Sequence, residues 1–329
     1  MDQRNRADRV FLALLAFVVL SWFVSRWMTD GENNPRPAPS EPMETLAGQR
    51  GIVSGKVMTV DTTGKTDEEL SRMEFPKQIR RFQFDPGNSV GPQTIDALRV
   101  HGDIDEVVFG PGVTDEALDA ASSLVALKSI VVVEASASCT NAGLKNIGRL
   151  SNLRSLWITG YSMDDGAFAN VGGCQNLELI ATRARLSDKS AVVLSSLKHL
   201  RDLSVLNAEF TSAGLLALAK LTSLELLRMA ACEAEDDIVV KTFLGMPNLR
   251  VLEMKAYGIS DSGAARLVGH PSLEKLCLWT PSLGEKTLDA LKAATSLKHF
   301  SSYMPFFAAN RQALAAARAD LVFVPYDGQ

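Results

Sequence analysis

The sequence predicts an α/β solenoid in which a short strand, a loop and a short helix repeat along most of the chain. Two observations support this fold: a leucine-rich phrase recurs at a nearly constant interval, and the charged residue inside that phrase alternates in sign. In such an array the strands form one parallel sheet on the concave face, and the helices cover the convex face. We therefore expect one extended repeat domain and no second folded domain.

The recurring phrase has the form Leu-x-x-Leu-x-Leu, as in "LSNLRSLWI" from Leu150. Its marker leucine, which precedes two variable residues, returns every 23 to 26 residues. An interval of this length is typical of a solenoid whose units bury their apolar faces by stacking on one another. The markers are Leu127, Leu153, Leu177, Leu200, Leu224, Leu249, Leu273 and Leu297.

Charged residues follow the markers, and their sign alternates along the array. When two earlier, less regular repeats are included, eight of the nine steps in this column reverse sign. Because equivalent positions on adjacent parallel strands lie about 4.8 Å apart, the column predicts a ladder of cross-strand ion pairs. Exposed pairs contribute only about 0 to 1 kcal/mol each, so we expect them mainly to fix strand register. The column is Arg80, Asp105, Lys128, Arg154, Glu178, Arg201, Glu225, Arg250, Glu274 and Lys298.

A polar residue followed by aspartate comes after the strand in most repeats, as in Thr114-Asp115, Ser187-Asp188 and Ser260-Asp261. Hydroxyl and carboxylate oxygens at a helix start accept hydrogen bonds from free backbone N–H groups, and the negative charge suits the helix dipole. We interpret these acids as helix caps and not as catalytic groups.

The repeats resemble those of the leucine-rich repeat superfamily, most of all its ribonuclease-inhibitor-like and cysteine-containing branches. The resemblance rests on the repeated phrase followed by segments such as "ISDSGAARL", and it covers residues 75 to 326. It implies a horseshoe-shaped solenoid with helices on the outer face. One position departs from the family: the Asn or Cys expected five residues after the second leucine occurs in one of six compared repeats, as Cys232.

The N-terminal segment predicts a membrane anchor, as in a bacterial-type membrane-anchored member of the superfamily. An apolar run from Val10 to Val24 follows three arginines. Extended to residue 28, it reaches about 28 Å as a helix, close to the roughly 30 Å of a hydrocarbon core. A cleaved signal peptide is the alternative, but no small-x-small cleavage site follows the run. We expect a cytoplasmic tail at 1–9, a transmembrane signal anchor at 10–28 and a Pro-rich linker at 29–48.

The repeat domain is predicted over 49–329, outside the cytoplasm and therefore periplasmic or on the cell surface. The pattern loosens at both ends, as expected where a solenoid covers its last apolar face. These ends define an N-terminal cap at 49–78 and a C-terminal cap at 305–329.

Composition and motifs give no indication of catalysis, of a cofactor or of nucleic-acid binding. The net charge is -4 and no cluster of basic residues is present, which argues against general attraction to nucleic acid. The chain has no HExxH motif, no phosphate-binding glycine loop and no nucleophile elbow. We therefore predict a protein that is not an enzyme and that uses no metal and no small-molecule cofactor.

Histidine and cysteine residues are interpreted as structural. The four histidines, His101, His199, His270 and His299, lie in different repeats without metal-ligand spacing, which indicates surface or turn positions. A disulfide needs Cα atoms within about 7 Å, and the cysteines fall in repeats that are too far apart for this. We expect four free cysteines, Cys139, Cys174, Cys232 and Cys277.

Candidate binding residues project from the concave face at alternate strand positions. Aromatic and arginine side chains are frequent anchors of protein interfaces, and the predicted register places several of them on the solvated side of the sheet, with Tyr303 in the same row. The alternative is that the tryptophans only cover the sheet or pack on a flanking loop. The candidates are Trp157, Arg183, Arg228, Glu253, Lys255 and Trp279.

Together these features predict a membrane-anchored extracytoplasmic protein that binds another protein through its concave face. The identity of that protein partner is not encoded in any motif. The alternative is a structural or self-associating element of the cell envelope without a soluble partner.

Topology is testable with a reporter fused after Gln329, which we expect to behave as an exported domain. Mass spectrometry of the membrane-bound protein should then find residues 1–28 retained, because the apolar segment lacks a cleavage site. A mature protein that begins after residue 28 would contradict the anchor.

Overall fold

The computed structural model describes residues 51–54, 57–76, 78–84, 90–100, 103–133, 138–160, 162–232 and 235–325. The chain divides into two compact units, Met1–Pro42 and Met43–Gln329, and every described residue belongs to the second. The predicted tail, anchor and linker lie outside the described residues. Within the described ranges, none of the helices has the length and apolar character needed to cross a membrane.

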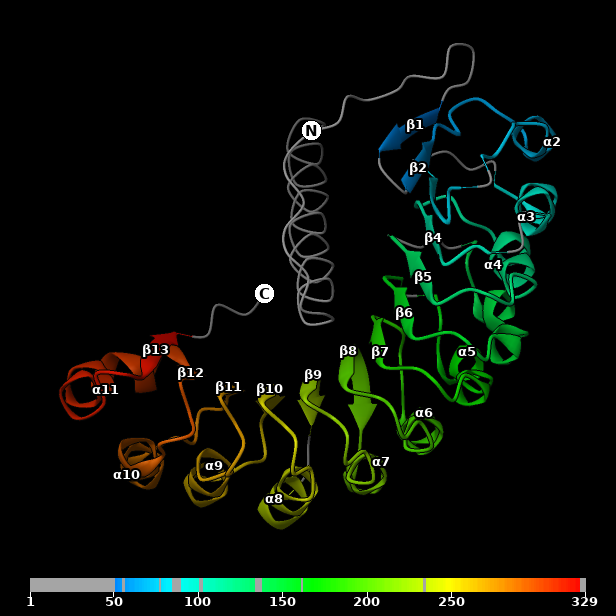
Figure 1. The fold of residues 1–329 in the computed structure, drawn as a ribbon. Helices are drawn as coiled ribbons and strands as arrows, with labels where there is room; N and C mark the ends of the chain where they lie inside the picture. The colour runs from blue at the N-terminus through cyan, green and yellow to red at the C-terminus, as the bar shows by residue number, and fades with distance from the viewer. Residues whose placement is uncertain are drawn as a thin grey trace, which may run out of the picture. The chain divides into compact units, whose positions relative to one another are not determined.

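Thirteen strands of the described chain form one sheet, and they follow one another in sequence order (Figure 1). The first pair is antiparallel and every later pair is parallel. Within this unit the strands line the inner side of an arc and the helices line its outer side (Figure 1). The strands are β1 (Gly51–Ser54), β2 (Val57–Val60), β3 (Arg81–Phe84), β4 (Glu106–Phe109), β5 (Ser129–Val132), β6 (Ser155–Ile158), β7 (Leu179–Thr182), β8 (Asp202–Phe210), β9 (Leu226–Cys232), β10 (Val251–Ala256), β11 (Lys275–Trp279), β12 (His299–Ser302) and β13 (Val322–Pro325).

Short helical segments connect successive parallel strands in the outer layer. The α-helices are α2 (Asp67–Ser71), α3 (Pro92–Arg99), α4 (Asp115–Ala121), α5 (Asp165–Phe168), α6 (Asp188–Leu194), α7 (Ser212–Leu218), α8 (Asp236–Leu244), α9 (Asp261–Val268), α10 (Glu285–Ala293) and α11 (Met304–Ala317). Between β5 and β7 the expected helices are partly replaced by the 3-10 segments η1 (Asn141–Leu144), η2 (Ile147–Arg149) and η3 (Val171–Gly173). Two glycines permit a close backbone approach there, since a Cβ on Gly173 would lie 2.8 Å from Gly148 Cα.

The leucines of the repeated phrase fill the space between sheet and helices. Leu203 and Leu252 are fully buried, as predicted for the central residue of the phrase. The predicted strand register is also confirmed, since Ser204, Arg228 and Glu253 face one another as Cα partners on adjacent strands. One position differs: an irregularity in β9 places Ala231 beside Lys255, where the repeat interval predicted Ala230.

The alternating charges form cross-strand ion pairs at several steps of the predicted column. Asp105 lies 3.0 Å from Arg80 on one side and 3.1 Å from Lys128 on the other. Arg250 and Glu274 form a pair at 2.7 Å. Further pairs join Arg154 to Glu178, Arg201 to Glu225 and Lys298 to Asp320. These side chains remain about a quarter to three-fifths exposed, so each pair contributes little to stability.

A second ladder follows the helix starts, and it corrects one part of the cap prediction. The hydroxyl residue caps its own helix as expected, since Ser260 Oγ accepts from Gly263 N at 3.2 Å. The aspartate instead binds the next repeat: Asp236 accepts from Ser260 N at 2.7 Å, and Asp261 accepts from Thr287 N at 3.0 Å. The aspartate is the first residue of its own helix and faces the start of the helix in the next repeat. The first N–H groups of that next helix have no partner within it, so they are free to donate to the aspartate. The same contact is made by Asp67, Asp115, Asp165 and Asp188.

His270 lies in the connection between α9 and β11, as predicted for a turn residue, but it is fully buried and not at the surface. Its Nε2 lies 3.1 Å from the Phe243 carbonyl oxygen, and its Nδ1 accepts from Ser272 N at 3.2 Å. The ring therefore joins two repeats by hydrogen bonds. Burial lowers the pKa of His270 below its ordinary value, although its bonds to backbone groups act in the opposite direction. His199 and His299 are exposed as predicted, and His101 lies outside the described residues.

Three of the cysteines are free, as predicted: Cys139, Cys174 and Cys277. All three are buried, and burial raises the pKa of the Cys139 and Cys174 thiols to about 12. Such thiols remain protonated and unreactive at neutral pH. That Cys232 is free stays a prediction.

Core and ladder positions should respond differently to truncation. We expect Leu203→Ala or Leu252→Ala to lower the free energy of unfolding by about 2 to 5 kcal/mol, because each leaves a cavity between sheet and helix. Arg201→Ala and Arg250→Ala, on exposed ladder positions, should lower it by less than about 1 kcal/mol. Urea denaturation measures both. Equal losses in the two classes would contradict this register.

The aspartate ladder should make stability depend on acid pH. Partial burial tends to raise the pKa of Asp261, but hydrogen bonds from Thr287, Gly284 and Lys286 lower it more, so the net pKa is below the ordinary 3.8. The charged form therefore stabilises the fold above pH 3.8, and this stabilisation is lost as the pH falls through the lower folded pKa.

We expect Asp261→Asn to lower the urea midpoint at neutral pH, and the difference from the unsubstituted protein should shrink below pH 3.8. Asp237→Asn is the matched control, because that acid also lies at a helix start but forms an exposed ion pair with Arg266. A deficit for Asp261→Asn that is the same at every pH would overturn the assignment.

Candidate functional site

The six predicted binding residues lie on or directly after strands of the sheet, and all are half-buried. They alternate with core residues; on β10, for example, Leu252 and Met254, on either side of Glu253, are fully buried. The candidates therefore face the concave side. By strand they are Trp157 on β6, Arg183 directly after β7, Arg228 on β9, Glu253 and Lys255 on β10, and Trp279 on β11.

The structure brings four of these residues together and leaves two apart. Glu253 is the Cα partner of Arg228, and Lys255 is the Cα partner of Trp279. Trp157 has Val131 and Ala181 as its neighbours in register. Trp157 and Trp279 are separated by five strand spacings, which is about 24 Å.

Glu253 is the centre of an ion-pair network. Its Oε2 accepts from Arg228 Nε at 2.8 Å, and its Oε1 accepts from Lys275 Nζ at 2.7 Å. Burial raises the pKa of Glu253, but the two cations lower it more, so the net pKa is below the ordinary 4.5. Arg228 and Glu253 therefore hold each other in place instead of presenting separate charges.

Lys275 is a concave-face residue that the sequence prediction missed. It lies at the start of β11, two and four residues before Cys277 and Trp279. Alternate residues of a strand share a face, so the same period that selected Trp279 also predicts this position. The prediction considered only two rows of the face, and Lys275 belongs to the row before them.

Three aromatic rings form a cluster at the C-terminal ends of β10, β11 and β12. The Trp279 ring contacts Tyr257 edge-to-face at 5.0 Å and Tyr303 edge-to-face at 5.4 Å. Tyr257, which sequence reasoning did not select, follows β10 and remains 48% exposed. Trp279 thus packs on flanking segments, as the alternative interpretation held, while the cluster still faces solvent.

Lys255 is the basic residue beside this cluster. Within the described ranges, no carboxylate lies at ion-pair distance from its ammonium group. Its strand neighbours are Ala231 and Trp279, which carry no charge. The concave positions of β9 to β11 thus hold three basic residues, Arg228, Lys255 and Lys275, and the single acid Glu253.

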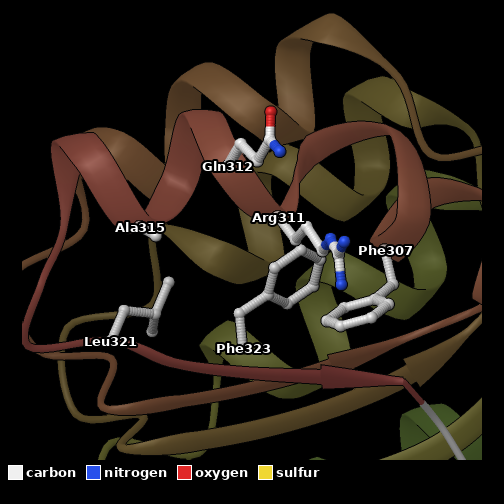
Figure 2. Close-up of a pocket in the computed structure, with 6 residues that line it drawn as sticks. All are labelled: Phe307, Arg311, Gln312, Ala315, Leu321 and Phe323. Carbon is white, nitrogen blue, oxygen red and sulfur yellow. The ribbon is translucent and has the colours of Figure 1, made fainter.

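A hollow of about 370 Å³ lies elsewhere, between α11 and β13 (Figure 2). The rings of Phe307 and Phe323 contact each other there at 5.0 Å, and Gln312 points away from them (Figure 2). None of the six predicted residues lines it. Its lining is Phe307, Arg311, Gln312, Ala315, Leu321 and Phe323.

No group of three or more His, Cys, Asp or Glu side chains in the described ranges is arranged to hold a metal ion. Over β9 to β11 the concave face presents aromatic surface, one paired acid and several basic groups. This arrangement offers contact area and charge for a macromolecular partner.

Solved structures of leucine-rich repeat proteins share this fold. An internalin from Listeria monocytogenes matches with a TM-score of 0.51 and 14% identity, over 73% of this chain and 72% of that one. Internalin C2 from Listeria monocytogenes matches with a TM-score of 0.44 and 17% identity, over 64% and 83%. The leucine-rich repeat ectodomain of the membrane receptor kinase GASSHO1/SCHENGEN3 from Arabidopsis thaliana gives 0.39 and 16%, over 76% and 31%.

At these identities the likeness concerns the fold alone, and the match at a TM-score of 0.51, together with the parallel sheet and its outer helices, confirms the predicted leucine-rich repeat solenoid. No protein-family profile matches the chain, and no curated protein matches it in sequence. The ribonuclease-inhibitor-like subtype stays a prediction.

The Glu253 network should contribute more to stability than an exposed ladder pair. Glu253→Gln leaves Arg228 and Lys275 side by side without a carboxylate, so we expect the free energy of unfolding to fall by about 1 to 3 kcal/mol. Glu274→Gln, in the exposed ladder, is the control and should lower it by less than about 1 kcal/mol. Denaturant titration at neutral pH measures both. Equal effects would show that the network is no stronger than a surface pair.

Proposed function

We propose that this chain is a membrane-anchored extracytoplasmic leucine-rich repeat protein that binds another protein through its concave face. It acts without catalysis and without a cofactor. The observation that supports the proposal best is the aromatic cluster around Trp279, which lies on the solvent side of a sheet whose other side is fully buried. Large aromatic side chains in such positions are frequent anchors of protein interfaces.

The dimensions of the face suit a protein partner. The candidate residues extend over β6 to β11, and the aromatic cluster continues to Tyr303 after β12. Six spacings between β6 and β12 give about 29 Å across the strands. A standard protein interface needs about 800 Å² on each partner, so a partner seated on these strands would also contact the loops or strands beside them.

In this proposal, three N-terminal segments precede the repeat domain. Residues 1–9 form the cytoplasmic tail, 10–28 the uncleaved anchor and 29–48 the linker, as the sequence predicts. The repeat domain then occupies 49–329, with caps at 49–78 and 305–329. The linker holds the domain away from the bilayer, on its periplasmic or cell-surface side.

A second function, self-association within the cell envelope, is favoured by the last strand. In the described chain β13 pairs on one side only, with β12, and its Val322 and Val324 are 46% and 44% exposed. An unpaired strand edge with exposed valines is a template for pairing with another chain. In this alternative the solenoid is a structural element and the concave face binds no soluble partner.

Capture experiments separate the two functions. The full-length protein in detergent, immobilised and exposed to an extract of its own cells, should retain a partner, and Trp157→Ala or Trp279→Ala should weaken that binding by about 1 to 4 kcal/mol. Val192→Ala, on an exposed position of α6, is the control and should leave binding unchanged.

Thermal unfolding of the same variants shows whether they fold. Trp279→Ala loses its ring contacts with Tyr257 and Tyr303, each worth about 0.5 to 1.5 kcal/mol, so a small decrease in melting temperature is expected. Capture that survives substitution of all six predicted residues would exclude the concave face. Self-association that survives them while no soluble partner is retained would support the structural function.

A further inference from the structure

The C-terminal end of the concave face combines one positive charge with an apolar surface. Lys255 and Trp279 are Cα partners on β10 and β11, and the Trp279 ring contacts Tyr257 and Tyr303. Tyr257 lies two residues beyond Lys255, and Tyr303 directly follows β12. Lys255 and the three aromatic residues therefore lie on or directly after three adjacent strands, within about two strand spacings, roughly 10 Å.

The charge balance at this end differs from that of the whole chain. The chain carries a net charge of -4. The concave positions of β9 to β11 instead hold three basic residues and one acid, and that acid is already shared by Arg228 and Lys275. Lys255 is the basic residue of this group that has no carboxylate at ion-pair distance within the described ranges. A partner that brings a negative charge to Lys255 would complete the pairing.

The geometry of the rings limits what the cluster can hold. At 5.0 and 5.4 Å between centroids, the rings are in contact with one another. No space for a ligand remains between them, so a partner lies against their exposed surfaces. A cationic ligand on these surfaces is disfavoured, because it would meet the like charge of Lys255 beside the rings.

We propose that this end of the concave face binds an acidic, extended segment of a protein partner. A carboxylate of the segment pairs with Lys255, and an apolar side chain two residues away packs on Tyr257, Trp279 and Tyr303. Side chains at positions i and i+2 of an extended peptide lie on one side about 6.6 Å apart, so one can face Lys255 while the other faces the rings. The segment therefore has the pattern acid-x-aromatic or acid-x-aliphatic. This inference rests on the proposed function, since it names the kind of partner that the face accepts.

Synthetic peptides test this pattern directly. Full-length protein in detergent is titrated into fluorescent peptides that carry Glu-x-Phe, Lys-x-Phe or Glu-x-Ala between Gly-Ser flanks, and into fluorescent oligo-dT. Fluorescence anisotropy reports binding at about 50 mM and about 300 mM NaCl, because screening weakens exposed ion pairs. We expect Glu-x-Phe to bind at least about tenfold more tightly than either other peptide, and its affinity to fall with added salt.

Matched variants locate the contacts. Lys255→Met keeps the length of the side chain without its charge and should weaken Glu-x-Phe binding by about five- to tenfold. Trp279→Ala should weaken it by about tenfold or more, and Tyr257→Ser, at a half-exposed position, provides a second variant should the first fail to fold. Lys189→Met, at an exposed position of α6, should change nothing.

Several results would overturn the inference. They are equal binding of Lys-x-Phe, unchanged binding after Lys255→Met, no measurable binding of Glu-x-Phe at about 1 mM peptide, or binding of oligo-dT with no peptide preference. The proposed function is judged separately by partner capture. If a captured partner depends on Trp157 or Trp279 but not on Lys255, concave-face binding stands and the acidic segment is wrong. If a partner is still captured after substitution of all six predicted concave-face residues, the proposed function fails as well.

Discussion

The structure depends on one spacing, the distance between equivalent positions on adjacent parallel strands, about 4.8 Å. The residue after each marker leucine shows how strictly this spacing is kept. The N–H of Lys128 donates to Asp105 O, and the N–H of Arg154 donates to Lys128 O, both at 2.8 Å. The same residues bear the alternating charges, so one column carries both the backbone bonds and the ion pairs. The nearest neighbour of a strand residue in this fold is therefore often the equivalent residue of the next repeat.

The aspartate ladder shows this coupling in the choice of residues. Where a repeat begins its helix with aspartate, the third helical residue of the next repeat is Gly, Ser or Thr. Thr94 and Thr287 donate their hydroxyl groups to Asp67 and Asp261, both at 2.6 Å. Gly214 makes room instead, since a Cβ there would lie 2.2 Å from the Asp188 carboxylate. A small or hydroxyl-bearing residue is thus required by a carboxylate that lies more than twenty residues earlier in the chain.

Most of the architecture was predictable because it repeats. The interval between Leu203 and Leu252 follows from stacking units of similar length, and the alternation of charge follows from the pairing of adjacent strands. A register error would have disrupted both patterns at once. The features that were not predicted each occur only once in the described chain. The irregularity of β9 shifts Ala231 beside Lys255, and the ring of His270 is buried although the residue lies in a connection; neither feature leaves a periodic signal. The candidate site shares this difficulty, because the sharing of Glu253 between Arg228 and Lys275 depends on how far individual side chains reach.

The linear order of the sheet bears on how the domain loses its structure. Each strand of the described chain hydrogen-bonds only to its neighbours in sequence, so no contact between distant strands ties the ends together. Arrays of this kind behave as a row of coupled units, in which a disturbed unit separates two stacks that each keep their own neighbours. The segments between β5 and β7 contain 3-10 turns, whose hydrogen-bond geometry is poorer than that of the longer α-helices in the later repeats. Local opening begins most readily there, and amide hydrogen exchange would divide the domain at that point into an N-terminal and a C-terminal block.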